Sequence, residues 1–369
     1  MKRVVAWGLI GALAMSLAAC GGNANSGEKE SGKAAVTETD ATGAAVAETE
    51  LESENNGDFS TEYNWAFATT YGSGTVVVQS YQKFAELAKE YTSGSVIINL
   101  YPDGQLVASE DDSMAQLSAG EIEFVGTGSM PWWIYSTDYA WTQAPFMITD
   151  ADTYENVYNS DTIKAVRQSW ADNYNVKDLC GGFYRGMRKL AATKKVGNVG
   201  DLSGLKLRMN SSALWNSAWQ SLGAVTVPLS LNELYTSIQT GVVEGCENPL
   251  SESGYLNIPE VTSYVMNTNH VAEYAIVCMN NDLYESLPEN YQTALINAWT
   301  DAMDWARAEV EKEEAGWIKK YQEAGCEIVD FDIESAREAS IPFWKEMFES
   351  GEWAMSYDEV MSLIEECSK

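Results

Sequence analysis

Two patterns of hydrophobic and polar residues, one typical of strands and one typical of helices, alternate along the middle of this 369-residue chain. Stretches with an alternating or continuous apolar pattern predict strands at 65–70, 95–101 and 121–126. Apolar side chains at every third position predict a helix at 76–89, and a second helix is predicted at 109–118, before Gly120 as a C-terminal cap. Strands that alternate with helices of this length are typical of βαβ units and a mostly parallel sheet. We therefore expect an α/β lobe here.

A second series of predicted elements begins near Arg185. It contains strands at 205–209, 224–228 and 242–247, with helices between them. A further strand at 274–279 is expected to return the chain to the first lobe. The pattern thus predicts two α/β lobes, formed by 61–185 plus 274–313 and by 186–273 plus 314–369.

The longest helical stretch runs over 286–325. It begins with Pro288 in the first turn, where the missing N–H is harmless, and no later proline interrupts it. About 35 helical residues would span roughly 50 Å, which exceeds one lobe. We expect a helix that ties both lobes together. The alternative is two shorter helices that break near Gly316. Residues 331–369 are expected to form helices that pack on the second lobe.

The N-terminal segment has the layout of a secretory signal. Lys2 and Arg3 precede a short apolar run, and Leu-Ala-Ala-Cys follows at 17–20. This resembles the lipobox of bacterial lipoproteins, which implies that 1–19 is removed and that Cys20 carries the lipid. A plain signal peptide with an incidental cysteine is the alternative. Residues 20–60 are acidic and poor in large apolar groups, so we expect a disordered tether to the bacterial cell membrane.

Composition excludes several functions. The formal net charge of −31 argues against nucleic acid as a partner, because a phosphate binder needs a basic surface. His270 is the only histidine, which removes most histidine-based triads and any histidine-rich metal centre. We expect no metal, no cofactor and no enzymatic activity. An extracellular glycoside hydrolase with paired carboxylates stays open as an alternative. So does an ABC-type binder of a neutral sugar, given 13 tryptophans.

Arg208 is the candidate for ligand chemistry. It lies near the carboxyl end of a predicted strand, on the face opposite Leu207 and Met209, and ligands of open α/β sheets bind beyond such ends. Its planar guanidinium can hold a carboxylate through two hydrogen bonds. Asn248 and Glu247 end the neighbouring predicted strand. Asn248 could add a polar contact, and Glu247 could hold an arginine from behind. The alternative is a purely structural Arg208–Glu247 ion pair.

A family resemblance rests on motifs that occur in order over roughly 200 residues. They are Tyr-Pro-Asp-Gly-Gln-Leu at 101–106, Gly-Met-Arg at 186–188, Asp-Leu-Ser-Gly-Leu-Lys-Leu-Arg at 201–208, Gln-Thr-Gly-Val-Val-Glu-Gly-Cys-Glu-Asn-Pro at 239–249, Thr-Asn-His at 268–270 and Leu-Pro at 287–288. With these motifs, the run from Trp65 to Gly325 resembles the DctP-type solute-binding proteins of TRAP (tripartite ATP-independent periplasmic) transporters.

The resemblance implies a two-lobed fold of the periplasmic-binding-protein type (type II-like), with a mostly parallel sheet and flanking helices in each lobe. It also implies an extracytoplasmic, lipid-anchored receptor that binds a small organic acid and delivers it to the permease subunits in the membrane.

The resemblance also assigns roles to residues of the pocket. It implies that Arg208 binds the ligand carboxylate, that Arg188 and Asn248 also contact the ligand, and that Glu247 and His270 hold the arginines. Other pocket positions implied by the resemblance are Thr70, Gly128, Ser211 and Leu231. The aromatic segment 131–135 lies close in sequence to the pocket wall, and it either faces an aromatic or sugar-derived acid or packs in the core.

Overall fold

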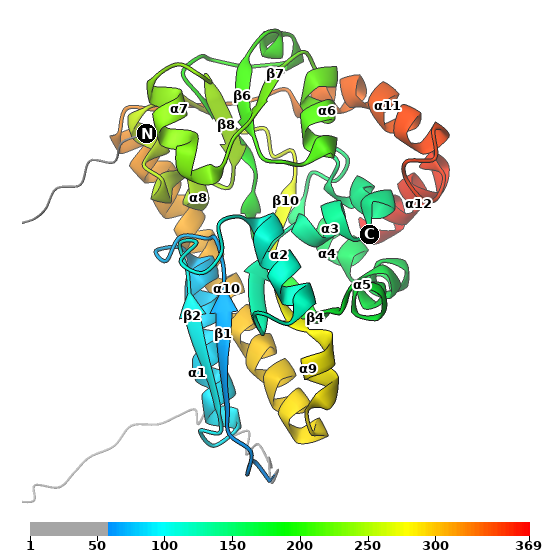
Figure 1. The fold of residues 1–369 in the computed structure, drawn as a ribbon. Helices are drawn as coiled ribbons and strands as arrows, with labels where there is room; N and C mark the ends of the chain where they lie inside the picture. The colour runs from blue at the N-terminus through cyan, green and yellow to red at the C-terminus, as the bar shows by residue number, and fades with distance from the viewer. Residues whose placement is uncertain (1–57) are drawn as a thin grey trace, which may run out of the picture. The chain divides into compact units, whose positions relative to one another are not determined.

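The computed structural model describes residues 58–369. The expected signal peptide 1–19, the lipid site Cys20 and residues 20–57 of the expected tether lie outside the described residues. The rest of the chain forms two sheets with helices around each (Figure 1). We call the half around the first sheet the first lobe and the half around the second sheet the second lobe.

The first sheet has the strand order β2-β1-β3-β10-β4. Its strands are β1 (Tyr63–Ala68), β2 (Val96–Tyr101), β3 (Phe124–Thr127), β4 (Val176–Met187) and β10 (Ala272–Asn280). The second sheet has the order β11-β9-β5-β8-β6-β7. Its strands are β5 (Lys189–Ala192), β6 (Lys206–Met209), β7 (Val225–Pro228), β8 (Gly245–Asn248), β9 (Tyr264–Met266) and β11 (Glu327–Val329).

Each sheet is mostly parallel, as expected, with one reversed strand. In the first sheet β10 is antiparallel to both β3 and β4. In the second sheet β5 is antiparallel to both β8 and β9. Both reversed strands follow a crossing between the lobes, since β5 continues β4 after Arg188 alone and β10 follows β9 after residues 267–271. These two crossings place Arg188 and His270 where the lobes meet.

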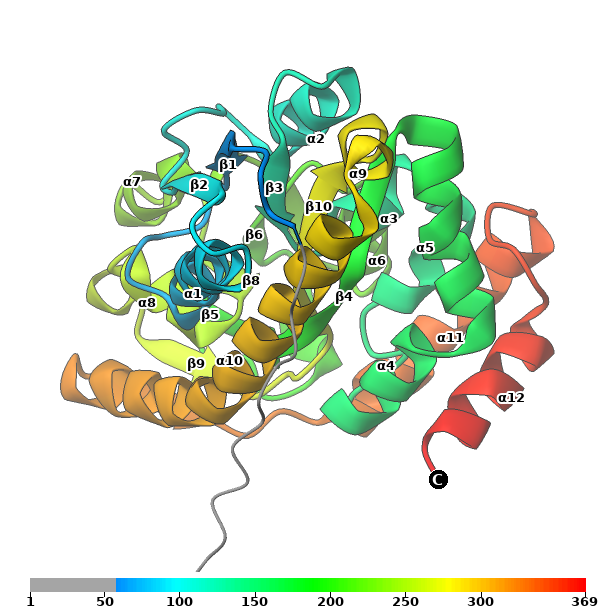
Figure 2. The same cartoon turned by 90° about the horizontal axis from the view of Figure 1, so that it is seen from below.

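Helices cover both faces of the first sheet (Figure 2). They are α1 (Val76–Tyr91), α2 (Glu110–Ala119), α3 (Met130–Ile134), α4 (Ala151–Tyr158), α5 (Asp161–Tyr174), α9 (Asn281–Ser286) and α10 (Glu289–Glu323). Strand β10 shows why both faces need cover, because all nine of its residues are buried. Ile276 packs in a core with α2, α3 and α5, and Val277 packs in a core with α1 and α10. Adjacent strand residues point to opposite faces.

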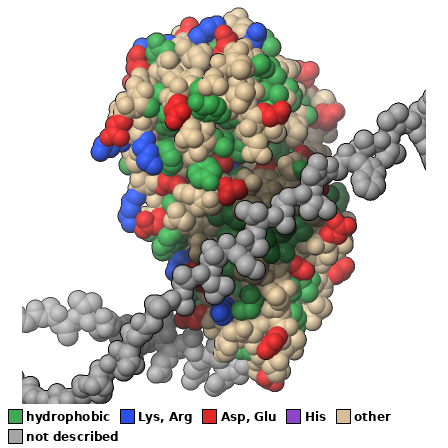
Figure 3. Space-filling model, turned by 60° about the vertical axis from the view of Figure 1, so that its left-hand side comes forward, with side chains coloured by type: hydrophobic (Ala, Val, Ile, Leu, Met, Phe, Trp, Pro, Cys, Tyr) green, Lys and Arg blue, Asp and Glu red, His purple; other side chains and the backbone are tan. Residues whose placement is uncertain are grey.

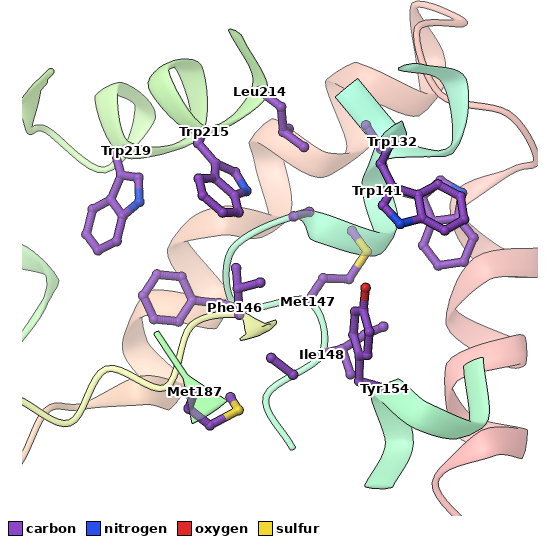
Figure 4. Close-up of a cluster of buried hydrophobic side chains, with 14 of the residues drawn as sticks. Trp132, Trp141, Phe146, Met147, Ile148, Tyr154, Met187, Leu214, Trp215 and Trp219 are labelled. Carbon is purple, nitrogen blue, oxygen red and sulfur yellow. The ribbon is translucent and has the colours of Figure 1, made fainter. Parts of the chain in front are cut away.

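The second lobe has its own helices, α6 (Ala213–Ser221), α7 (Leu234–Gln239), α8 (Leu250–Tyr255) and α11 (Ile333–Glu349), and the last helix of the chain is α12 (Tyr357–Cys367). Short 3₁₀ helices occur at Thr137–Gln143, Val199–Leu202, Leu231–Glu233 and Ile258–Glu260. Trp215 and Trp219 of α6 point toward the segment that contains Phe146 and Met147 (Figure 4). These residues belong to one core that also includes Trp132 of the first lobe, so the lobes share packed side chains.

Helix α10 is continuous over 35 residues. It contacts α1 and β4 in the first lobe and α8 and β11 in the second lobe, so it ties the lobes together as expected. The alternative break near Gly316 does not occur.

The C-terminal helices divide between the lobes. Helix α11 lies against α6, as expected, but α12 lies against α4 of the first lobe, where Asn156 donates a hydrogen bond to the carbonyl of Cys367. Helix α12 also contacts α11, so it packs against both lobes and not on the second lobe alone.

Charged side chains of both signs are scattered over the face of the molecule seen in Figure 3. No basic patch gathers on this face. Within residues 58–369, no helix combines the length and apolarity needed to cross a membrane. The same residues contain no cluster of three or more His, Cys, Asp or Glu side chains suited to a metal ion.

Candidate functional site

A cavity of about 390 Å³ lies between the two lobes. Parallel strands of both sheets end beside it, since Thr70 comes just after β1, Ser211 just after β6, and Asn248 ends β8. This is the position that open α/β sheets use for ligands. The lining side chains used below are Thr70, Tyr71, Glu110, Asp111, Trp133, Arg185 and Glu273 from the first lobe, and Arg188, Arg208, Ser211, Leu231, Asn248 and Glu252 from the crossing and the second lobe.

Arg208 is buried on β6, with only 5% of its surface exposed. Its Nε donates a hydrogen bond to the carbonyl of Leu229 at 2.9 Å. Its two Nη groups have no hydrogen-bond partner, and no carboxylate lies within ion-pair distance of it, among the residues that the structure describes. Burial lowers the pKa of Arg208 because it disfavours the charged form. The site therefore holds a guanidinium whose charge is not balanced by a direct partner.

Unlike Arg208, Arg188 is paired directly with carboxylates. Its Nε donates to Glu247 Oε2 at 2.5 Å, its Nη1 to Glu273 Oε1 at 3.1 Å and its Nη2 to Asn248 Oδ1 at 2.9 Å. The guanidinium carbon lies 4.2 Å from the centre of the Trp215 ring. The alternative Arg208–Glu247 ion pair does not form, because Glu247 pairs with Arg188.

His270 lies behind this pair and does not line the cavity. Its Nε2 is 2.8 Å from Glu247 Oε2, and its Nδ1 is 2.8 Å from the Thr268 hydroxyl. Burial lowers the pKa of His270, although the adjacent Glu247 opposes the shift. For Glu247, burial opposes ionisation, but Arg188 and His270 overcome it and lower the pKa to about 2. Glu247 is thus an anion that fixes Arg188 in place.

Sequence reasoning missed several charged residues of the cavity, among them Arg185, Glu252 and Glu273. Arg185 Nη2 donates to Glu273 Oε2 at 3.1 Å, and Arg185 Nη1 lies 3.7 Å from Glu252 Oε2. Glu273 carries a signal that could have revealed it, because it is a lone acid in an otherwise apolar strand. Glu252 carries none, because the acidic residue of a helix's first turn is usually a solvated one. Arg185 was noticed only as the start of the second lobe.

The remaining predicted positions lie as follows. Thr70, Ser211 and Leu231 line the cavity, and the Ser211 hydroxyl donates to Asp111 Oδ2 of the other lobe at 3.2 Å. Gly128 is not among the residues that line the cavity, although its neighbour Ser129 is. A side chain at Gly128 would meet the Tyr71 hydroxyl at 2.9 Å and Glu273 Oε2 at 3.0 Å, which fill that space.

Both expectations for the aromatic segment 131–135 are met, because one tryptophan lines the cavity and another packs in the core. Trp133 lines the cavity and packs edge-on against Trp215, with ring centroids 4.7 Å apart. Trp132 and Trp141 are fully buried in the core (Figure 4), and neither lines the cavity.

Comparison with known proteins agrees with this architecture. The model of the family described as bacterial extracellular solute-binding protein, family 7 (DctP), matches residues 67–351. The sialic acid-binding periplasmic protein SiaP of Vibrio cholerae is 27% identical over 277 residues, which cover 74% of this chain and 84% of that protein. The C4-dicarboxylate-binding periplasmic protein DctP of Rhodobacter capsulatus is 27% identical over 247 residues, which cover 66% of this chain and 72% of that protein.

Solved structures share the fold. A TRAP periplasmic solute-binding protein from Roseobacter denitrificans, solved with bound β-D-glucuronate, superimposes with a TM-score of 0.75 at 22% identity. The match covers 83% of this chain and 99% of that one. The matched family model spans both lobes and the cavity between them. The chain belongs to family 7 of the bacterial extracellular solute-binding proteins, the DctP family of TRAP transport systems.

Proposed function

We propose that this protein is a TRAP solute receptor that binds a small organic acid between its lobes, with Arg208 holding the carboxylate. The named ligands of its relatives support the class of compound, because sialic acid, C4-dicarboxylates and glucuronate are all organic acids. The observation that carries the proposal is the buried guanidinium of Arg208, whose Nη groups have no partner within the described residues.

Asn248 supplies a second unmet donor beside Arg208. Its Oδ1 accepts from Arg188 Nη2 at 2.9 Å, so its Nδ2 must be the atom left over. That Nδ2 is buried and has no hydrogen-bond partner in the described part of the chain. A buried donor without a partner costs about 1–3 kcal/mol. A carboxylate that accepts from Arg208 and Asn248 would satisfy both residues, and it would be held in one orientation.

The delivery step and the membrane anchor complete the proposal. The ligand would pass from the closed lobes to the permease subunits, and a lipid on Cys20 would keep the receptor at the membrane. Cys20 lies outside the described residues, so the lipobox pattern is what supports the anchor.

A thermal-shift screen tests the proposal. We expect at least one compound among monocarboxylates, dicarboxylates, sugar acids and aromatic acids to raise the unfolding midpoint, because a ligand that binds the folded state stabilises it. The Arg208→Ala variant should lose that shift, and neutral sugars should produce none. A neutral sugar that stabilises both proteins equally would overturn the proposal in favour of a sugar binder.

A further inference from the structure

Glu252 is a buried carboxylate whose charge is poorly balanced. Only 3% of its surface is exposed, and it lines the cavity from α8. Its Oε2 has no hydrogen-bond partner among residues 58–369. The nearest cation, Arg185, stands 3.7 Å away and already donates to Glu273 at 3.1 Å. An ionised oxygen in this position lacks the donor that a buried carboxylate needs.

Glu110 adds a second carboxyl group to the cavity lining from the opposite lobe. It lines the cavity, and its Oε1 accepts from the Thr127 hydroxyl at 3.3 Å. Its charge opposes the ionisation of Glu252 across the cleft. Two lobes thus present two acids to one space.

The arginines of the site cannot balance these acids. Arg188 is engaged by Glu247 and Glu273, and Arg185 is shared between Glu273 and the more distant Glu252. In the proposed function the third cation, Arg208, is taken up by the carboxylate of the ligand. A second ligand carboxylate would then meet net negative charge, whereas a cation would complete the site.

We propose that the bound acid is zwitterionic: a monocarboxylate whose other end carries a protonated amine, with the amine held by Glu252 opposite Glu110. This inference rests on the proposed function, because it takes Arg208 as the carboxylate site. It departs from the dicarboxylates named for the DctP relatives, which would place a second anion beside these acids. A hydroxyl group could donate to Glu252 but would leave its charge unbalanced.

Matched ligand series test this on the unmodified protein. Calorimetry with butyrate, 4-hydroxybutyrate, 4-aminobutyrate and succinate, and with the six-carbon series hexanoate, 6-hydroxyhexanoate, 6-aminohexanoate and adipate, varies only the terminal group at two lengths. We expect the amino acid of at least one series to bind roughly tenfold or more tightly than its hydroxy acid, with the dicarboxylate weakest, because a desolvated ion pair outweighs a hydrogen bond to a neutral group.

Variants test whether the preference for the amino acid depends on the carboxylate of Glu252. Glu252→Gln should weaken binding of the amino acid by roughly 30-fold or more, because the amine loses its counter-charge. Binding of the hydroxy acid should stay within about threefold, since glutamine still accepts a hydrogen bond. Glu327→Gln makes the same change at an exposed site paired with Lys195 and should alter neither.

The outcomes are distinguishable. A dicarboxylate or hydroxy acid that binds as tightly as the amino acid overturns the zwitterion proposal, and so does an amino acid that is indifferent to Glu252→Gln. The zwitterion proposal is also overturned if no amino acid binds while another acid binds in an Arg208-dependent way. If Arg208→Ala leaves the affinity for every bound acid unchanged, the proposed function itself fails.

Discussion

Three buried arginines line one cavity, and they differ in how far their charges are balanced. Arg188 contacts two carboxylates, Arg185 contacts one closely and one at 3.7 Å, and Arg208 contacts none within the described residues. Leaving a buried charge unpaired costs several kcal/mol. Ionisable groups with perturbed pKa values gather at functional sites. An unpaired buried charge there can be completed by a charged group of the ligand. Arg208, the arginine without a carboxylate partner among the described residues, is therefore the one assigned to the ligand.

The pH dependence of stability should report on Glu252. Burial raises its pKa to about 7, with Glu110 and Glu313 adding to the rise while Arg185 and Arg188 oppose it. Because this value lies above the roughly 4.3 of a free glutamate, the folded state holds the proton more tightly. The ionised carboxyl therefore destabilises the fold above pH 7, and the penalty fades as the pH falls toward about 4.

Without ligand, Glu252→Gln should accordingly stabilise the protein at pH 8 by about 2–3 kcal/mol more than at pH 5. Urea unfolding at both pH values measures this difference, with Glu327→Gln as the matched exposed control. The same stability change at both pH values would show that Glu252 is not ionised against a penalty in the fold.

At the level of residues, the sequence could reveal the side chains that stand in distinctive positions. Arg208 follows from strand alternation, and the placement of Arg188, Asn248, Glu247 and His270 follows from the motif resemblance. Glu252 and Glu110 could not be found in this way, because acids in the first turn of a helix are common. Only the folded chain brings these two together.

Local sequence patterns predicted where strands lie in the chain better than they predicted the direction in which each strand runs in its sheet. Strands such as β2 and β6 were placed within a residue, because their apolar alternation is local. Strand β4 was not recognised, because Gly181 and Gly186 interrupt its pattern and adopt φ values of 101° and 117° there. The reversed directions of β5 and β10 depend on pairing between segments far apart in sequence, which periodicity does not encode.

Helix α10 offers a test at this scale. Gly316 lies exposed in its interior, and a Cβ there would meet nothing within 4 Å. Gly316→Ala should stabilise the protein by about 0.5–1 kcal/mol, because alanine loses less backbone entropy on folding. Urea unfolding checks this value.

Gly254 of α8 provides the contrasting case. A Cβ there would meet the ring of Trp317 on α10 at 2.2 Å, so Gly254→Ala should destabilise the protein by about 1–3 kcal/mol. A Gly316→Ala variant that is also destabilised would show that the helix is not continuous through this position.

At the scale of the whole molecule, side-chain hydrogen bonds join the two lobes. Ser211 donates to Asp111 at 3.2 Å, and the Tyr255 hydroxyl donates to Asp103 at 3.0 Å. Each pair joins a residue of the second lobe to one of the first. The polypeptide crosses between the lobes at Arg188, at residues 267–271 and along α10, and α12 returns to contact α4 of the first lobe. A closing motion would have to bend or shift the chain at these places.

Ligand binding should therefore change the distance between the lobes. We expect small-angle scattering to give a smaller radius of gyration with a ligand found in the thermal-shift screen than without it. Coinciding scattering curves at saturating ligand would contradict closure, while leaving the carboxylate site itself untouched.

The most direct measurement is calorimetric titration of Arg208→Ala with an acid that binds the unmodified protein. Loss of the guanidinium should cost roughly 2–5 kcal/mol, which weakens the dissociation constant by about 30-fold to several thousand-fold. Arg307→Ala removes an exposed arginine that pairs with Asp304 and Glu155, and it should leave affinity unchanged. An Arg208→Ala protein that folds normally and binds the acid as tightly as the unmodified protein would contradict the account.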